Sequence, residues 1–300
     1  DRYEKYIEES LPAEVPQMFG LHPNAEIGYL TTTAETLFGN IMTIQGGGGG
    51  GVGKKQEEAV KEIIDKFLEV LPEDFNMVEI ATTITDINPY IVVSIQECER
   101  MNTLLQEIRK SLNDLDAGLK GQLNITEAME ALSNSLAINQ VPASWADKAY
   151  FSKKTLADWF ADLLLRVEQV TTWIENLEVP KSLWISGLFN PMSFLTAIMQ
   201  VTAREFGLPL DSMCLRTDVT NMWEVDEVAG PAEKGMYIHG LFLEGAQWEK
   251  GRGSEQGYLT EMAPKILHPN LPVVNVLAVQ LEERETVGYY RCPVYYTTMR

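Results

Sequence analysis

The sequence predicts an α+β fold, in which a helical subdomain is followed by a mostly antiparallel sheet or a small β-barrel. Two observations support this class. Through residues 56–180, apolar residues recur at three- and four-residue steps, which is the spacing of amphipathic helices. After Pro180, short apolar runs alternate with loops rich in Gly, Pro and charged residues, a pattern typical of strands. Strands that follow the helices, instead of alternating with them, indicate an α+β arrangement.

Four segments are expected along the chain. Residues 1–45 contain irregular stretches and two helices, at about 1–10 and 29–43. Residues 46–55 include six consecutive glycines, and this composition favours a flexible linker. The helical subdomain then covers residues 56–180. The barrel-like α/β subdomain covers residues 181–300.

The helical subdomain contains two long apolar stripes. They lie at residues 91–119 and 156–177, and from Leu105 onward the first follows a heptad spacing. Such stripes predict neighbouring helices packed along their seams, with a surface for another protein's helix as the alternative. Trp159 and Trp173 widen the second stripe, which favours an internal core. Two shorter helices are expected at residues 54–71 and 127–138.

The α/β subdomain begins with an expected strand at residues 182–189. Asn190 and Pro191 then supply an N-cap and an N1 proline, and the helix that follows runs to Phe206 with Gly207 at its C′ position. Further strands are expected at residues 213–219, 236–243, 273–281 and 289–297. Apolar residues on both faces of the 236–243 run predict burial on both sides or a closed barrel.

The charge balance excludes several classes of partner. Lysine and arginine number 24 against 43 aspartates and glutamates, giving a net charge of −19. Nucleic acids and anionic membrane surfaces repel such a protein, so neither is expected as a partner. The three cysteines (Cys98, Cys214 and Cys292) and three histidines are scattered, so no disulfide framework, zinc site or other metal site is expected.

One motif resembles a phosphate-binding loop. Gly48, Gly53 and Lys54 match the Gly-x-x-x-x-Gly-Lys part of a P-loop, and a helix is expected to follow. Lys55, however, stands where a Ser or Thr would hold Mg²⁺, and a glycine run matches any glycine pattern. No later strand ending in acidic residues supplies the metal-side carboxylate. An autonomous nucleotide-binding protein that uses this loop is therefore kept only as the alternative function. No cofactor is expected in this segment.

The remaining polar groups also point away from catalysis. The pairs Glu97/Glu99 and Asp114/Asp116 are two residues apart on expected helices, so a solvated face is the simplest interpretation. His239 lies among apolar residues of a strand, as packed histidines do. The glycines between residues 251 and 257 suggest a hairpin loop. No catalytic residue is expected, and the residues alone indicate that this segment is not an enzyme.

Several stretches resemble the C-terminal region of dynein heavy chains, in order along nearly the whole sequence. The most specific is WISGLFNPMSFLTAIMQ at residues 184–200. Its residues resemble those of axonemal, outer-arm β-type chains more than those of cytoplasmic ones. The others are MFGLHPNAEI (18–27), GMYIHGLFLEGAQW (235–248), PKILH (264–268), LPVV (271–274) and CPVYYT (292–297). Family members continue with a further strand segment beyond the position of Arg300, so we expect the closing strand to be missing here.

This resemblance implies a role in a minus-end-directed microtubule motor without the motor's chemistry. In the family, ATP and Mg²⁺ are bound by earlier AAA modules, and the C-terminal region packs on the AAA ring and tunes its output. The implied partners are the AAA modules of the same chain, together with dynein intermediate chains, light chains and other heavy chains. The implied location is the cytoskeleton of a ciliary or flagellar axoneme. No direct contact with microtubules is expected, because their surface is acidic.

Overall fold

The computed structural model describes residues 2–10, 15–46, 53–243, 245–251, 257–263 and 270–280. The chain forms two compact units. The first comprises Asp1–Gln45 with Phe242–Leu271, and the second comprises Gly46–Leu241 with Pro272–Arg300. Helices and two separate sheets together confirm the α+β class. None of the described helices is long and apolar enough to cross a membrane.

The first unit contains two helices and a small antiparallel sheet. Its helices are α1 (Arg2–Ser10) and α2 (Asn24–Gly46), and its strands are β4 (Ala246–Glu249) and β5 (Tyr258–Glu261). Helix α2 begins five residues earlier than expected, directly after Pro23. There the Asn24 N–H donates to His22 Nδ1 at 3.2 Å, while His22 Nε2 contacts the Met262 carbonyl at 2.9 Å.

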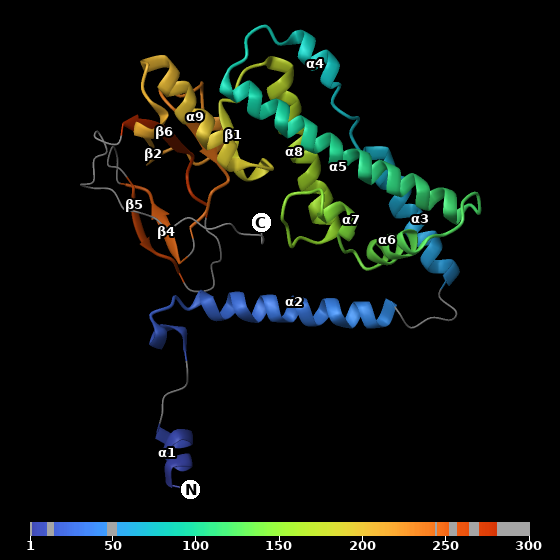
Figure 1. Cartoon of the computed structure of the whole chain (residues 1–300). Coiled ribbons are helices and arrows are strands. Elements are labelled where there is room, and N and C mark those ends of the chain that lie inside the picture. Colours follow the sequence, from blue (N-terminus) through green and yellow to red (C-terminus); the bar gives the residue numbers. More distant parts are fainter. Residues whose placement is uncertain are drawn as a thin grey trace. The chain divides into compact units, whose positions relative to one another are not determined.

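Six helices form the first part of the second unit (Figure 1): α3 (Gly53–Val70), α4 (Met77–Thr83), α5 (Pro89–Leu119), α6 (Glu127–Ala137), α7 (Ala143–Ala146) and α8 (Leu156–Asn176). The short helices α4 and α7 were not predicted. Helix α5 begins where expected, because Asn88 Oδ1 accepts the Ile91 N–H at 3.0 Å and Pro89 occupies the first turn.

The two apolar stripes pack against each other as predicted. Leu105 and Leu112 of α5 and Leu163 of α8 are fully buried, and they belong to one hydrophobic cluster. The Phe67 and Phe160 rings stack within the same cluster at a centroid distance of 4.0 Å. The stripes therefore build an internal core, and the alternative of an open surface for another protein's helix is wrong.

A four-stranded mixed sheet completes the second unit. Its strands are β1 (Ser182–Trp184), β2 (Met213–Val219), β3 (Met236–His239) and β6 (Val274–Gln280), in the order β1-β3-β6-β2. Strand β1 runs parallel to β3, and the other two pairings are antiparallel. Helix α9 (Pro191–Phe206) packs on β2 and β6 (Figure 1). Its predicted caps are confirmed, since Asn190 accepts the Ser193 N–H and Gly207 has a φ of 66°.

Two strands are shorter than predicted. The 182–189 run forms a strand only to Trp184, and a 3-10 helix, Ile185–Gly187, follows. The 236–243 run ends its strand at His239, because Gly240 adopts a φ of +77°, outside the strand region. The expected strand at residues 289–297 and residues 47–51 of the glycine run lie outside the described residues.

Candidate functional site

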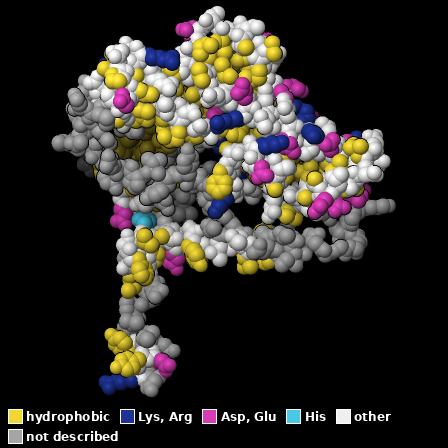
Figure 2. Space-filling view, in the orientation of Figure 1, with side chains coloured by type: hydrophobic (Ala, Val, Ile, Leu, Met, Phe, Trp, Pro, Cys, Tyr) yellow, Lys and Arg dark blue, Asp and Glu magenta, His cyan; other side chains and the backbone are white. Residues whose placement is uncertain are grey.

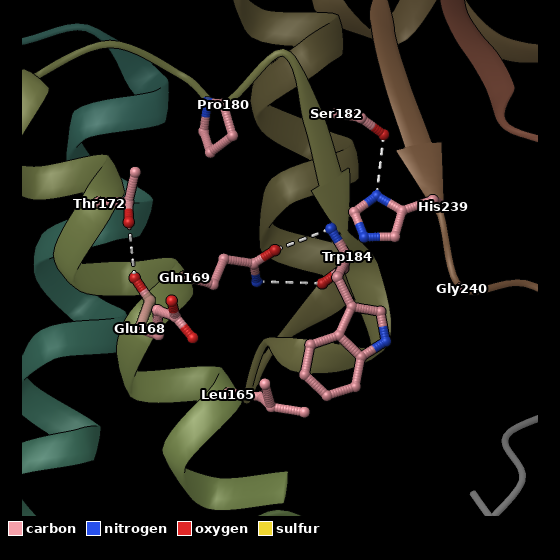
Figure 3. Close-up of a pocket in the computed structure, with 9 residues that line it drawn as sticks. All are labelled: Leu165, Glu168, Gln169, Thr172, Pro180, Ser182, Trp184, His239 and Gly240. Carbon is pink, nitrogen blue, oxygen red and sulfur yellow. Dashed lines mark hydrogen bonds between the residues drawn. The ribbon is translucent and has the colours of Figure 1, made fainter. Parts of the chain in front are cut away.

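Two adjoining pockets along helix α8 form what we call the α8–β1 groove. Their volumes are about 510 Å³ and about 490 Å³. Thr172, Pro180 and Ser182 line both pockets, so the two adjoin. Figure 3 shows the first pocket, whose other lining residues are Leu165, Glu168, Gln169, Trp184, His239 and Gly240. The second pocket adds Glu178, Val179, Lys181, Val225, Asp226 and Val228.

Helix α8 supplies one wall of the groove through its outward face. Leu165, Glu168 and Thr172 follow one another at three- and four-residue steps, so they share one side of the helix. Leu165 keeps 56% of its surface exposed, whereas Leu163, two residues earlier, is fully buried. The same helix therefore builds the core with one face and the groove with the other.

Trp184 forms the aromatic wall of the groove, and two glycines leave room for its indole. A Cβ at Gly187 would lie 2.5 Å from the indole Cε3, and one at Gly240 would lie 2.4 Å from Cδ1. Both distances are far below the 3.5–4.0 Å of a favourable carbon–carbon contact. Glycine at these two positions therefore leaves the room that the indole occupies in this orientation.

Gln169 binds the backbone of Trp184 through both ends of its amide (Figure 3). The Trp184 N–H donates to Gln169 Oε1 at 2.8 Å, and Gln169 Nε2 donates to the Trp184 carbonyl at 3.1 Å. This arrangement reproduces the donor–acceptor pair that a neighbouring strand would offer. The side chain of Gln169 thus closes the outer edge of β1 at one residue.

Ser182 and His239 form a hydrogen-bonded pair at the back of the groove. Ser182 Oγ lies 2.8 Å from His239 Nδ1 (Figure 3). Burial lowers the pKa of His239, because it disfavours the charged form of the imidazole. A serine nucleophile also needs a group that orients the histidine. Within the described part of the protein, no second group is bonded to this ring. The pair fits a positioning role for the β1–β3 strands.

Buried charges lie behind the indole. Arg166 is 4% exposed, and its guanidinium sits 3.5 Å from the Tyr150 ring centroid and 5.0 Å from that of Trp184. Asp162 accepts from Arg166 at 3.2 Å and from Lys154 at 3.0 Å. Stacking between aromatic faces suits a planar guanidinium. This network joins α8 to β1 from the core side of the groove.

Glu97 makes a second buried connection between the helices and the α/β part. Its carboxylate, on α5, accepts the Phe189 N–H at 2.6 Å and the Asn190 N–H at 3.0 Å, at the start of α9. Glu97 is 1% exposed, and this burial raises its pKa, although the two N–H donors act in the opposite direction. The expectation that Glu97 lies on a solvated face is therefore wrong; Glu99 is exposed.

The P-loop-like residues occupy a context unlike that of a nucleotide site. Gly48 lies outside the described residues, and Gly53 and Lys54 begin helix α3. A P-loop connects a strand to a helix, but the element before this glycine run is helix α2. The other glycine-rich stretch, between residues 251 and 257, joins the antiparallel strands β4 and β5, as predicted for a hairpin.

Gln169 and Arg166 were not singled out from the sequence, and Glu97 was assigned to a solvated face. Glu97 does carry a usable signal, because it lies four residues before the buried Met101 and therefore falls on the apolar stripe of α5. A charged residue on such a stripe must find a buried partner. In the described ranges, no group of three His, Cys, Asp or Glu side chains is arranged to hold a metal ion.

Comparisons with known proteins give a consistent result. The sequence model for the C-terminal domain of dynein heavy chains matches residues 31–300. The protein is 48% identical to a ciliary dynein beta chain of Heliocidaris crassispina, and 46% identical to dynein axonemal heavy chain 17 of Homo sapiens. It is 43% identical to the flagellar outer-arm dynein alpha chain of Chlamydomonas reinhardtii. Each match covers 99% of this chain and 7% of the relative's length.

Proposed function

The chain belongs to the family of C-terminal domains of dynein heavy chains, and from this membership we propose that it is a non-catalytic, regulatory domain of an axonemal motor. In this proposal it packs on the AAA ring of a minus-end-directed microtubule motor and tunes the ring's output. ATP and Mg²⁺ are bound by earlier AAA modules of the parent heavy chain. The location is a ciliary or flagellar axoneme, in keeping with the ciliary and flagellar names of its relatives.

The observation that carries the packing proposal is the apolar surface of helix α2. Figure 2 shows hydrophobic side chains along this helix. The exposed fractions are 71% for Tyr29, 55% for Leu30, 60% for Leu37, 65% for Phe38 and 44% for Ile41. A row of large apolar side chains on one helix marks a surface that another protein element covers. The partner proposed here is a neighbouring module of the same heavy chain.

A domain without chemistry influences a motor through differential binding. It must bind two conformations of the ring with different free energies, since equal binding shifts no equilibrium. Glu97 and Gln169 support this role, because Glu97 joins α5 to the start of α9, which packs on the sheet, and Gln169 joins α8 to β1. A displacement of the helices is then passed to the sheet without a flexible joint between them.

The test uses the parent motor with Phe38→Glu in helix α2. A charge on the covered surface should weaken packing on the ring, so we expect ATP hydrolysis to persist while force or processivity changes. Val78→Glu is the matched control, because Val78 is 76% exposed on α4, outside the α2 surface. Complete loss of ATPase activity in a folded Phe38→Glu motor would contradict the regulatory proposal. Equal effects of the two variants would contradict packing through α2.

A further inference from the structure

The outer edge of β1 borders the α8–β1 groove, and Ser182, which is 7% exposed, lies there. The N–H and C=O of Trp184 point away from β3, since both are bonded to Gln169. Backbone groups alternate in direction along a strand, so those of Ser182 point to the same outer side. On this outer side, no described residue forms a hydrogen bond with the Ser182 backbone. One residue of an extended segment can therefore pair with β1 at this position.

The charges of the groove favour a cationic occupant. Glu168 lines the first pocket, and Glu178 and Asp226 line the second. The described residues offer these carboxylates no ion-pair or hydrogen-bond partner. The one ammonium among the lining residues, Lys181 Nζ, already donates to the Ala229 carbonyl at 3.1 Å. The whole protein has a net charge of −19, which adds to the attraction for cations.

The apolar part of the groove suits the stem of a long basic side chain. Trp184 presents its indole to the pocket, and Leu165 is 56% exposed beside it. Lysine and arginine pack their methylene groups on such surfaces and place the cation over an aromatic ring or beside a carboxylate. Glu168 lies one helical turn from Leu165 and can receive that cation.

We propose that the α8–β1 groove is a docking site for an extended, basic polypeptide segment of a partner protein. The segment pairs its backbone with β1 at Ser182 and places a lysine or arginine between Trp184 and Glu168. This proposal is independent of the packing of α2 on the ring, because it concerns a different surface.

The test measures binding of a fluorescently labelled hexapeptide of alternating Val and Arg to the full 300-residue protein. Three probes serve as comparisons: a Val/Glu peptide of equal length, a Val/Arg peptide methylated at its backbone nitrogens, and spermine. We expect saturable binding of the Val/Arg peptide only. Backbone methylation should raise its Kd by about two- to tenfold, the effect of one lost hydrogen bond.

Two substitutions locate the binding site. Glu168→Gln removes a groove carboxylate at an exposed position, and should raise the Kd about two- to fivefold, as expected for one surface ion pair. Glu205→Gln removes an exposed carboxylate on α9, outside the groove, and should leave the Kd unchanged. The absence of saturable binding, equal effects of the two substitutions, insensitivity to methylation, or full competition by spermine would each overturn the proposal.

Discussion

At the scale of single residues, buried polar groups determine how the molecule is held together. Glu97 is an example, because its burial raises the pKa of the carboxyl while two backbone N–H groups bind it. Arg100 and Arg166 also favour its charged form, and burial outweighs them. The consequence is a pH-dependent contribution to stability.

We expect the unfolding free energy of the natural protein, relative to Glu97→Gln, to fall as the pH rises above 4.5, the ordinary pKa of the group. Between that value and the raised pKa, the folded carboxyl holds a proton that the unfolded state has lost. Its contribution is therefore fully present below this window and is lost through it. Urea denaturation at a series of pH values measures the difference.

Glu99→Gln serves as the control for this comparison, because Glu99 is an exposed neighbour on the same helix. It reports the effect of removing one surface charge. A difference between the natural protein and Glu97→Gln that rises with pH would contradict the assigned direction of the pKa shift.

The glycine run leads to a second residue-scale prediction. The isolated protein should show no saturable ATP binding, and Lys54→Ala should change nothing in a calorimetric titration with ATP and Mg²⁺. Helix α2 stands before the glycines where a P-loop has a strand, and Lys55 replaces the metal-binding hydroxyl. Saturable binding that Lys54→Ala abolishes would restore the nucleotide-binding alternative.

At the scale of elements, the apolar stripes predicted the long helices α5 and α8 and their packing. Apolar residues at helical spacing share one face of a helix, and the fold buries that face. The caps of α9 were also predictable from the sequence, because Asn190, Pro191 and Gly207 act on the helix ends where they stand. The length of β1 could not be predicted in this way. Its run of apolar residues continues past Trp184 into the 3-10 helix Ile185–Gly187, so apolar character alone does not mark where the strand ends.

The two faces of α8 give an element-scale prediction. Leu163→Ala should lower the unfolding free energy by about 2–5 kcal/mol, because Leu163 is fully buried and its removal leaves a cavity. Leu165→Ala, on the exposed face, should change it by no more than about 0.5 kcal/mol. Chemical denaturation measures both. A cost below about 1 kcal/mol for Leu163→Ala would mean that the predicted core face is not tightly packed.

At the scale of the whole molecule, the second unit combines the six helices with α9 and the four-stranded sheet. The apolar spacing predicted a change from helices to strands at Pro180. It did not predict the connections that Glu97, Arg166 and Gln169 make between elements. Glu97 bonds Phe189, 92 positions along the chain, while Gln169 and Arg166 contact Trp184 on a different element, so the periodicity of a single helix does not encode these connections. The candidate groove was hidden for the same reason, since α8, β1 and β3 meet only in the fold.

We therefore expect the helices and the sheet of this unit to unfold together. Native-state hydrogen exchange should give the amides of α5 and β6 the same free energy of opening at low denaturant, because α9 packs against both elements. Exchange of β6 through an opening that leaves α5 protected would contradict this expectation and indicate separate folding units.

The amide of Gln169 has one further consequence, which concerns how easily the sheet can be extended. A strand that covers an edge is removed only by unfolding part of the protein, whereas a side chain leaves by rotating about its own bonds. Releasing the two hydrogen bonds to Trp184 costs about 1–3 kcal/mol in total. Under the docking proposal, a polypeptide that supplies the same donor and acceptor can replace Gln169 and extend its pairing with β1 from Ser182 alone to Ser182 and Trp184.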